Sequence, residues 1–575
     1  LHPARLPDAA ARPARKPVGR GGGGARPLEH RRQADDAAPD QGQLHGDRRA
    51  QPYARHRRDL PARGHPRRRG RAAGNGEGRL GQARRDGDRR RHQPHRRAGE
   101  GRGQDASRRR RRLRGGRGGR GRDHAGARRR RADDHRLPAR QHADRGAAQP
   151  RPRPDRGADG VSEGPLPHGP LTGLRVLDMS RILAGPTCGQ LLGDLGAEVI
   201  KIERPGRGDD TRAWGPPFVQ DAEGRDSAES AYYLCANRNK RSLALDIARP
   251  EGAAVARRLA ARSDVLLENF KLGDLVRRGL GYDDLAAENP GLVYCSITGF
   301  GQTGPYAHRA GYDFLIQGMG GIMSVTGEPE RQPMKVGVGI ADVMTGMYAS
   351  SAILAALRAR DATGRGQHVD LALFDSQIAW LINQGLAYLT DGVVPVRRGN
   401  AHPTIVPYET FPAADGWFIL AVGNDDQFRK FCAVADRPEI AADPGFATNA
   451  ARVRNRESLV PLLREITATR TQADWMTALE AAHVPCGPVN DIAQAFDDPQ
   501  AVHRGARITM EHPTAAGGTV DLIGNPVKLS ETPVTYRHAP PTLGEHSAEI
   551  LREAGFDAEE IAALAEAGVV AGAGL

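Results

Sequence analysis

The chain has 575 residues, an isoelectric point near 10.0 and a formal net charge of +15 at neutral pH. Residues 1–160 alone carry a net charge of +28, with 45 Arg and one Lys, which leaves −13 on residues 161–575. The first stretch contains no Ile, Met, Phe, Trp, Cys or Thr, so it cannot offset its ordering entropy by burying a core. These numbers exclude a uniformly basic globular protein and leave about 410 residues, enough for two domains.

We expect residues 1–165 to be a disordered Arg- and Gly-rich extension that results from mistranslation or misannotation. GC-rich DNA translated out of frame gives such a composition. The alternative is a basic arm that binds nucleic acid by neutralising phosphates. A targeting segment is disfavoured because no apolar core region is present in it. Nucleic acid is therefore not an expected partner of the rest of the chain.

The remaining residues favour a cytoplasmic enzyme with neither a metal nor a membrane partner. Five cysteines are present without any Cys-x-x-Cys pair, as expected of buried free thiols in a reducing compartment. No second pair of ligands accompanies His483 and Cys486, so a zinc site is not expected. No apolar run approaches the roughly 20 residues of a membrane helix.

Residues 174–209 predict a strand, a helix and a second strand, followed by a basic loop. The helix begins in the Ala-Gly-Pro run at 184–186, with Pro in its first turn, and the second strand covers 199–202. Arg204 and Arg207 then follow among glycines, an arrangement that suits a phosphate-rich ligand. Such a unit implies a parallel sheet with ligand chemistry at its carboxyl edge.

The pattern further along the chain predicts an α/β fold with a mostly parallel sheet. Strands are expected at 241–246, 264–270, 292–297 and 368–371, and helices at 250–262, 341–360 and 375–388. The pattern then changes to a hairpin around Asp415-Gly416 and helices from about 426, 457 and 471. We therefore predict a large α/β domain that begins at 166–390, a smaller α+β domain at 391–494, and a return to the large domain at 495–575. The return contains a strand at 520–523 and one helix at 551–565.

Three motifs carry candidate chemistry. Residues 299–304 match G-x-G-x-x-G after a strand, but Pro305 and Tyr306 follow in place of a helix, which favours a ligand-proximal loop over a dinucleotide site. Asp375 follows a strand among apolar neighbours, where it either caps the next helix or acts as a nucleophile on an activated acyl group. His402 is either an acid–base group or a polar residue of a turn.

The chain from about Gly173 to Val569 resembles the class III CoA-transferases, the family of formyl-CoA transferase and carnitine CoA-transferase. Six segments carry the resemblance: LDMSRILAGP at 177–186, GAEVIKIE at 196–203, NKRSLALD at 239–246, VLLENF at 265–270, GRGQHVD at 364–370 and PCGPV at 485–489. The resemblance implies a Rossmann-like sheet in the large domain and a homodimer of two interlocked rings. It implies CoA thioesters as substrates, together with small carboxylic acids, and no permanently bound cofactor.

The resemblance also implies roles for individual residues. Asp375 falls on the family nucleophile, which overturns the capping interpretation and implies catalysis through aspartyl anhydride and aspartyl-CoA thioester intermediates. The CoA contacts fall on Ile182, Leu183, Ala184, Arg204, Leu245, Ala248, Asn269, Phe270 and Arg277. Ala248 stands where formyl-CoA transferase has a lysine, so that contact is in doubt. The substrate-side residues are Trp214, Tyr232, Tyr312 and Asp313, the last as a carboxylate beside the nucleophile.

The alternative activity on this fold is α-methylacyl-CoA racemisation, which uses a His and an Asp. Tyr312 replaces that His and cannot serve as its base at neutral pH. The segment 401–408 resembles family members that use succinyl-CoA and a dicarboxylic acid such as glutarate. Arg397, Arg398 or His402 is then a candidate to pair the distal carboxylate, the alternative being solvated loop charges.

Overall fold

The computed structural model describes residues 168–575. All of these residues belong to one unit of the chain, Ala143–Leu575. The predicted extension at 1–165, and with it the nucleic-acid-binding alternative, lies outside the described residues. The predicted division at 390 and 494 stays a prediction.

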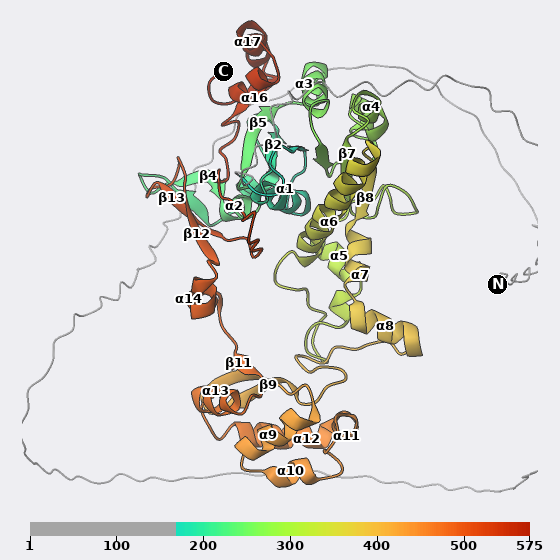
Figure 1. Ribbon diagram of the computed structural model, residues 1–575, viewed down its shortest axis with the longest axis vertical. Helices are drawn as coiled ribbons and strands as arrows, with labels where there is room; N and C mark the ends of the chain where they lie inside the picture. Colours follow the sequence, from blue (N-terminus) through green and yellow to red (C-terminus); the bar gives the residue numbers. More distant parts are fainter. Residues whose placement is uncertain (1–167) are drawn as a thin grey trace, which may run out of the picture. The chain divides into compact units, whose positions relative to one another are not determined.

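A seven-stranded sheet forms the centre of the fold, with the order β14-β5-β2-β1-β6-β7-β8 (Figure 1). Its strands are β1 (Arg175–Asp178), β2 (Glu198–Glu203), β5 (Lys240–Leu245), β6 (Val265–Glu268), β7 (Val293–Thr298), β8 (His368–Ala372) and β14 (Val570–Ala571). All neighbours are parallel except β14, which pairs antiparallel with β5. The prediction of an α/β fold with a mostly parallel sheet is confirmed.

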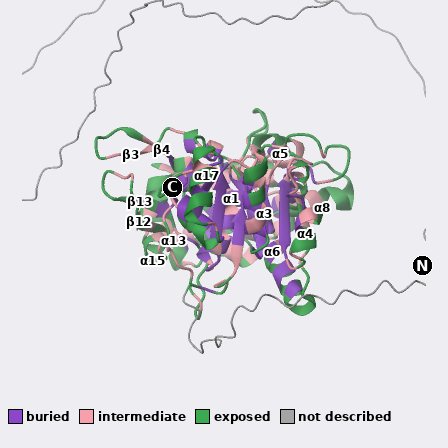
Figure 2. Ribbon diagram, turned by 90° about the horizontal axis from the view of Figure 1, so that it is seen from above, coloured by how far each residue is buried: buried purple, intermediate pink, exposed green. Residues whose placement is uncertain are grey.

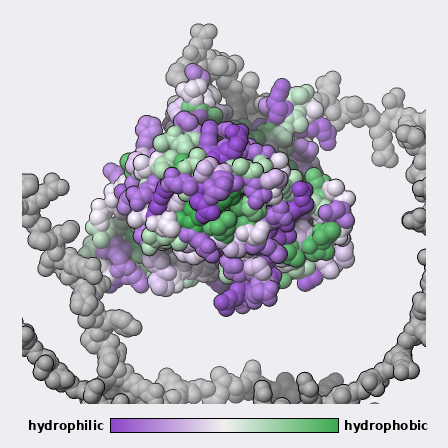
Figure 3. All heavy atoms as spheres, turned by 90° about the horizontal axis from the view of Figure 1, so that it is seen from below, coloured by the Kyte–Doolittle hydropathy of each residue, from purple (hydrophilic) through white to green (hydrophobic). Residues whose placement is uncertain are grey.

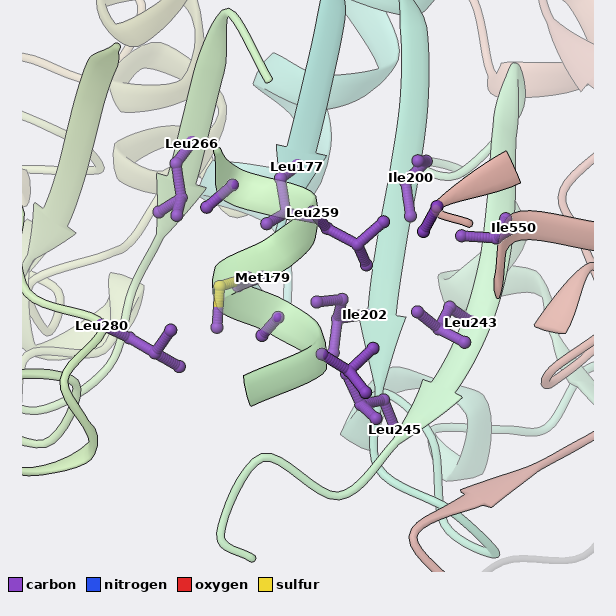
Figure 4. Packing of buried hydrophobic residues seen from close by; sticks show 14 of the residues in the cluster. Leu177, Met179, Ile200, Ile202, Leu243, Leu245, Leu259, Leu266, Leu280 and Ile550 are labelled. Carbon is purple, nitrogen blue, oxygen red and sulfur yellow. The ribbon is translucent and has the colours of Figure 1, made fainter. Parts of the chain in front are cut away.

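Both faces of this sheet are covered, because side chains alternate between faces along each strand. On β1, Val176 packs with α1 (Ala184–Asp194) and α6 (Ile340–Thr363), whereas Leu177 packs with α3 (Pro250–Ala260) and α16 (Ser547–Glu553). Figure 2 shows the buried strands among α1, α3 and α6, and Figure 4 shows Leu259 and Ile550 against the strand leucines and isoleucines. The central strands are therefore continuous apolar runs.

Helix α6 corrects the expectation that no apolar run is long enough for a membrane. Its 24 residues pass that test by length and composition, but half of its most apolar window is buried inside the protein. It packs against α1, α5 and β7, and its buried face includes the charged residues Asp342 and Arg360. These contacts are those of a core helix in a three-layer fold.

A second hydrophobic core lies at residues 406–486. The hairpin β9 (Tyr408–Ala413) and β10 (Gly416–Ala421) forms as predicted, β11 (Cys486–Pro488) pairs with β10, and Trp475 lies at the centre of the core. Its helices are α9 (Asp425–Val434), α10 (Pro438–Ala442), α11 (Asn449–Arg454), α12 (Arg456–Thr467) and α13 (Gln472–Ala481). The three predicted helices are present, with α10 and α11 in addition.

The remaining elements are short. They are β3 (Phe218–Gln220) with β4 (Asp226–Ser230), β12 (Arg507–Glu511) with β13 (Thr519–Ile523), η1 (Asp210–Ala213), α2 (Ala231–Leu234), η2 (Val276–Arg278), α4 (Tyr282–Glu288), α5 (Asp313–Met319), η3 (Ile322–Ser324), α14 (Ile492–Asp497) and α15 (Pro499–His503). The strand predicted at 520–523 is therefore β13, but it pairs with β12 in a sheet of its own.

Two predicted helices are interrupted. The helix expected at 375–388 is α7 (Leu373–Ala379) and α8 (Ile382–Asp391), because Ile382 has a φ of 39° that a continuous right-handed helix excludes. The helix expected at 551–565 is α16 and α17 (Ala558–Glu566). Gly555 between them has a φ of 83°, and Asp557 starts α17 with a capping box.

The buried guanidinium of Arg212 connects β2, β4 and the segment around Pro541. Arg212 pairs with Glu203 at 2.7 Å and with Glu229 at 2.6 Å, and it donates to the Tyr233 hydroxyl and the Pro541 carbonyl. All four side chains are buried. Removal of one partner from such a network leaves buried charge without compensation.

We therefore expect Arg212→Ala to lower the free energy of unfolding by about 3–5 kcal/mol. Urea unfolding followed by circular dichroism measures this change. The matched control is Arg225→Ala, because Arg225 pairs with Asp221 and Glu223 while its own side chain is 71% exposed. The control should leave the midpoint nearly unchanged, and equal midpoints for both variants would contradict the assigned role of Arg212.

Candidate active site

The loops that follow six parallel strands meet at one edge of the sheet, since parallel strands share their carboxyl ends. They place Ile182 after β1, Arg204 after β2, Ala248 after β5, Asn269 after β6 and Asp375 after β8. Residues 299–312 follow β7 without a helix until α5 begins at Asp313, as the ligand-loop interpretation requires. The sheet thus gathers segments that are far apart in sequence.

Hydrogen bonds, those of Lys201 among them buried, fix the loop after β1. Lys201 on β2 donates to the Ser180 carbonyl at 3.0 Å and to the Asp209 carboxylate at 2.9 Å. Asp209 in turn accepts the Ile182 N–H at 3.2 Å. Asn269 accepts the Arg181 N–H at 2.9 Å and donates to the Arg181 carbonyl at 2.7 Å. These bonds hold Ile182 in the left-handed region, with a φ of 73°.

A second buried lysine fixes the opening of α1. Lys240 on β5 donates to Asp178 at 2.9 Å, to the Pro186 carbonyl at 2.9 Å and to Asn237 at 3.0 Å. Burial lowers the pKa of Lys240 to about 8, although Asp178 favours its charged form. Burial would raise the pKa of Asp209, but Lys201 and hydrogen bonds from Thr211 lower it to about 2. Asp209 is therefore a fixed negative charge beneath the loop.

A cavity of about 300 Å³ opens beside these loops. Among the predicted residues Ile182, Ala184, Asn269, Phe270 and Tyr312 line it, whereas Leu183 is buried behind them as the residue that precedes α1. Gly299 lies in the lining and approaches Gly311 so closely that a Cβ at 299 would be 2.6 Å from the Gly311 Cα. No side chain larger than hydrogen fits there, so the two ends of the loop at 299–312 lie directly against each other in the cavity wall.

An adjoining cavity of about 350 Å³ shares Arg181, Phe270 and Asp274 with the first. Arg204, Leu245 and Ala248 line this second cavity, as does Arg278. Arg277 lies outside the lining of both cavities, with its exposed guanidinium paired to Asp274. The two cavities together form an elongated groove along the carboxyl edge, with cationic groups at one end.

Asp375 lies in the first turn of α7 rather than at its N-cap, which is Ala372 without a side-chain cap. Its side chain is exposed, and no hydrogen bond or ion pair holds its carboxylate within residues 168–575. Leu373, two residues before it, lines the first cavity. The helix-capping interpretation is therefore wrong, and Asp375 has a free carboxylate that lines neither cavity within the described residues.

The four substrate-side residues predicted from the resemblance do not share one environment. Trp214 packs edge-on against Tyr232 with ring centroids 5.2 Å apart, and Tyr312 projects into solvent with 66% exposure. Asp313 caps α6 instead of facing the groove: its carboxylate accepts the Ala341 N–H at 2.8 Å and the Gln317 amide at 2.7 Å. Asp342 does line the first cavity, together with Asp210 and Asp274.

The contacts of Arg397, Arg398 and His402 distinguish which of them is available to pair the distal carboxylate of a dicarboxylic acid. Arg397 donates to three backbone carbonyls, of Glu328, Pro329 and Arg331, and so secures a loop. His402 accepts the Thr404 N–H, and burial with Arg456 lowers its pKa, so it is neutral at pH 7. Arg398 remains: it lines a cavity of about 630 Å³ with Trp417 and Arg464.

Sequence reasoning missed several groove residues. Asp342, Arg181, Lys271, Thr298, His308 and Arg309 line the first cavity. Arg309 stacks over Tyr306 with 4.6 Å between guanidinium and ring centroid. The glycine-rich sequence at 299–311 was the available signal for the residues after β7. Asp342 gave none, because it lies inside a long apolar helix.

Of the five free cysteines, Cys188, Cys295 and Cys432 are buried as expected, whereas Cys235 is exposed and Cys486 is half-buried. The expectation of buried thiols therefore holds for three of them. Cys235 lies at the end of α2, and its thiol donates a hydrogen bond to the Tyr232 carbonyl. No cluster of three or more His, Cys, Asp or Glu with metal-site geometry occurs within residues 168–575.

Comparison with known proteins identifies the family. Residues 171–547 match the model of CoA-transferase family III, so the chain belongs to that family. It is a class III CoA-transferase, an enzyme whose substrates are CoA thioesters. The resemblance drawn from the six sequence segments is confirmed.

Two relatives and one solved structure illustrate the similarity. The chain is 51% identical over 385 residues to succinate–glutarate CoA-transferase of Agrobacterium fabrum, which covers 67% of this chain and 95% of the relative. It is 42% identical over 402 residues to human succinyl-CoA:glutarate CoA-transferase, covering 70% and 90%. A CAIB/BAIF family crystal structure from Brucella suis is 50% identical with a TM-score of 0.60, covering 67% of this chain and all of that one.

Ala248, which stands where formyl-CoA transferase has a lysine, allows a test of whether the second cavity binds the phosphates of CoA. Ala248 is exposed at the rim, so Ala248→Lys adds a cation there without displacing a packed side chain. We expect a KM for acyl-CoA lower by about 3–10-fold at low salt, because a new charge-assisted contact to phosphate becomes possible, with kcat unchanged.

Steady-state kinetics at two salt concentrations measure this change. The control is Ala450→Lys, which adds the same charge at an exposed position on α11. If both variants change KM equally, the second cavity does not hold the CoA phosphates.

Proposed function

We propose that this enzyme transfers CoA from succinyl-CoA to a dicarboxylic acid, with glutarate as the first candidate acceptor, and that Asp375 carries the covalent intermediates. The observation that carries this proposal is the position of Asp375: an unpaired, exposed carboxylate in the first turn of α7, the helix that follows β8 at the carboxyl edge of the sheet. The names of the 42–51% identical relatives support the donor and the acceptor.

The groove suits CoA in shape and charge. We place the diphosphate and 3′-phosphate in the second cavity, beside Arg204 and Arg278, and the pantetheine arm past Phe270 into the first cavity. Backbone N–H groups of the loop at 299–311 are then available to an oxyanion near Leu373. Leu183 acts from behind, as a buried support of Ile182, whereas the buried Leu245 forms part of the wall of the second cavity.

The proposed reaction conserves a high-energy acyl bond at each step. The Asp375 carboxylate attacks the thioester carbonyl, the C–S bond breaks, and an aspartyl–succinyl anhydride and CoA thiolate form. The thiolate attacks the aspartyl carbonyl, which releases succinate and leaves an aspartyl-CoA thioester. Glutarate carboxylate attacks that thioester to give a second anhydride and thiolate. The thiolate then attacks the glutaryl carbonyl, and glutaryl-CoA leaves with the Asp375 carboxylate restored.

We propose Arg398 as the partner of the distal carboxylate. Neither Arg397 nor His402 offers a free charge, as described above. Residues 168–575 contain no carboxylate ion-paired with Arg398. Its cavity is also lined by Asn400, by Glu328, and by Glu409, which pairs with Arg464. An acceptor panel in which only monocarboxylates react would overturn the dicarboxylate part of the proposal.

We further propose a homodimer, in the interlocked arrangement that the family resemblance implies. No residue of α8 is buried, although Ile382, Leu386 and Leu389 are apolar, and Leu389 is 78% exposed. The exposed apolar run continues through Val393 and Val394. Further apolar patches interrupt the hydrophilic face in Figure 3. A continuous apolar surface of this kind is typical of obligate interfaces, and a second copy is the occupant we propose.

Asp375→Ala should abolish formation of glutaryl-CoA from succinyl-CoA and glutarate, a loss of at least about 10³-fold, because no carboxylate remains to form the anhydride. Mass spectrometry of CoA esters measures it. Asp361→Ala removes an exposed carboxylate on α6 and should retain activity. Succinyl-CoA without acceptor should leave a CoA adduct on the Asp375 peptide of the unsubstituted enzyme. An adduct elsewhere would contradict the assignment.

Leu386→Glu with Leu389→Glu should reduce the fraction of protein that assembles into folded dimer, since two charges cannot be buried unpaired in an apolar interface. Sedimentation velocity over a range of protein concentrations measures the change. Val276→Glu, on an equally exposed apolar residue outside α8, serves as the control. A monomeric unsubstituted enzyme would overturn the dimer without affecting the assignment of Asp375.

A further inference from the structure

Asp342 is a buried carboxyl group of the groove that the proposed chemistry does not use. It lies in the first turn of α6 with only 8% of its surface exposed, and it lines the first cavity together with Leu373 and Tyr312. No sequence motif marks it. Within residues 168–575 its carboxyl oxygens have no hydrogen-bond partner, and they are not among the sealed, unsatisfied buried atoms. The open side of this group is therefore the cavity.

The surroundings of Asp342 favour its neutral form. Burial and the nearby charge of Asp313 raise the pKa of Asp342 to about 7. The Asp313 carboxyl oxygens accept hydrogen bonds from the Ala341 N–H and the Gln317 amide, so Asp313 is not a hydrogen-bond partner for Asp342. The Tyr232 hydroxyl also lies within electrostatic range. The charged or titratable groups across the cavity are Arg181, Asp210, Lys271, Asp274, His308, Arg309 and Tyr312.

A neutral carboxyl group differs from an ionised one in its hydrogen bonding. Ionised, it only accepts and repels an anion. Protonated, it has one O–H donor, and a carboxylate is the strongest acceptor for it. The acid substrates of a CoA-transferase enter as carboxylates, and they must approach Asp375, which is itself negative. A proton on Asp342 removes one of the negative charges that would oppose them.

We propose that Asp342 in its protonated form donates a hydrogen bond to the reacting carboxylate of the acid substrate and positions it for transfer. This inference rests on the proposed function and adds a positioning residue to it. Binding of the acid then requires a proton on Asp342. Since the folded-state pKa is raised, this contribution is present at low pH and is lost as the pH rises through 7.

The test compares kcat/KM for glutarate, with succinyl-CoA saturating, between pH 6 and pH 9. Asp342→Asn keeps an N–H donor at every pH, so the ratio of Asp342→Asn to unsubstituted enzyme should rise about tenfold per pH unit above 7. Substrate ionisation is common to both proteins and cancels in this ratio. Asp342→Ala has no donor and should be at least about tenfold below Asp342→Asn at all pH values.

Two controls separate a positioning role from a structural one. Glu268→Gln replaces another buried carboxyl group whose pKa burial raises to about 7, but which lines a different cavity, and it should keep the pH profile of the unsubstituted enzyme. The Kd of free CoA, measured by calorimetry, should agree within twofold between Asp342→Asn and the unsubstituted enzyme at each pH.

Three outcomes would overturn the inference. The kcat/KM ratio of Asp342→Asn to unsubstituted enzyme could be independent of pH, or it could change in parallel with the Kd of CoA. Alternatively, Asp342→Asn and Asp342→Ala could have equal activity. All three outcomes leave CoA transfer at saturating glutarate intact, so the proposed function would stand. Absence of glutaryl-CoA with the unsubstituted enzyme would instead refute the proposed function itself.

Discussion

The candidate site depends on two lysines that lie in the protein interior, Lys201 and Lys240. Each is fully buried, and each offers its ammonium protons to one carboxylate and to other oxygens. Buried ion pairs contribute little net stability, because the desolvation of both charges offsets their attraction. Their directional hydrogen bonds instead define where the backbone at 178–186 must lie. That backbone forms one wall of the groove.

The carboxyl groups near this wall show how one edge of a sheet supports different chemistry. Lys201 keeps Asp209 ionised, so it serves as a fixed acceptor under the loop after β1. The Asp313 carboxyl group accepts a hydrogen bond from the Ala341 N–H at the amino end of α6. Asp342 lacks such partners and is half-protonated near neutral pH, whereas Asp375 is exposed and free of contacts within the described residues. Environment rather than residue type separates their roles.

Much of this architecture could be predicted from the sequence. The strands of the central sheet are buried on both faces, so they stand out as short apolar runs. The family resemblance, not strand pattern, supplied 182–184, 269–270 and 375 as candidate site residues, and all of them follow strands at the carboxyl edge. The helix break at Ile382 escaped prediction because no glycine, proline or capping residue marks it, whereas the break at Gly555 has local signals in the glycine and in the capping box at Asp557 that the periodicity alone did not reveal. The orientation of Asp342 toward the cavity, and of Asp313 away from it, depends on how α5 meets α6, which no local pattern records.

Ile182 illustrates a further consequence of this architecture. A β-branched residue with a φ of 73° is strained by roughly 1–2 kcal/mol, whereas glycine adopts this conformation at no steric cost. The Ile182 side chain lines the first cavity, so the strained residue supplies apolar surface where a ligand lies. Selection for thermal stability alone would favour glycine here, and selection for turnover would oppose it. Position 182 is thus a point at which stability and activity trade against each other in the evolution or engineering of this enzyme.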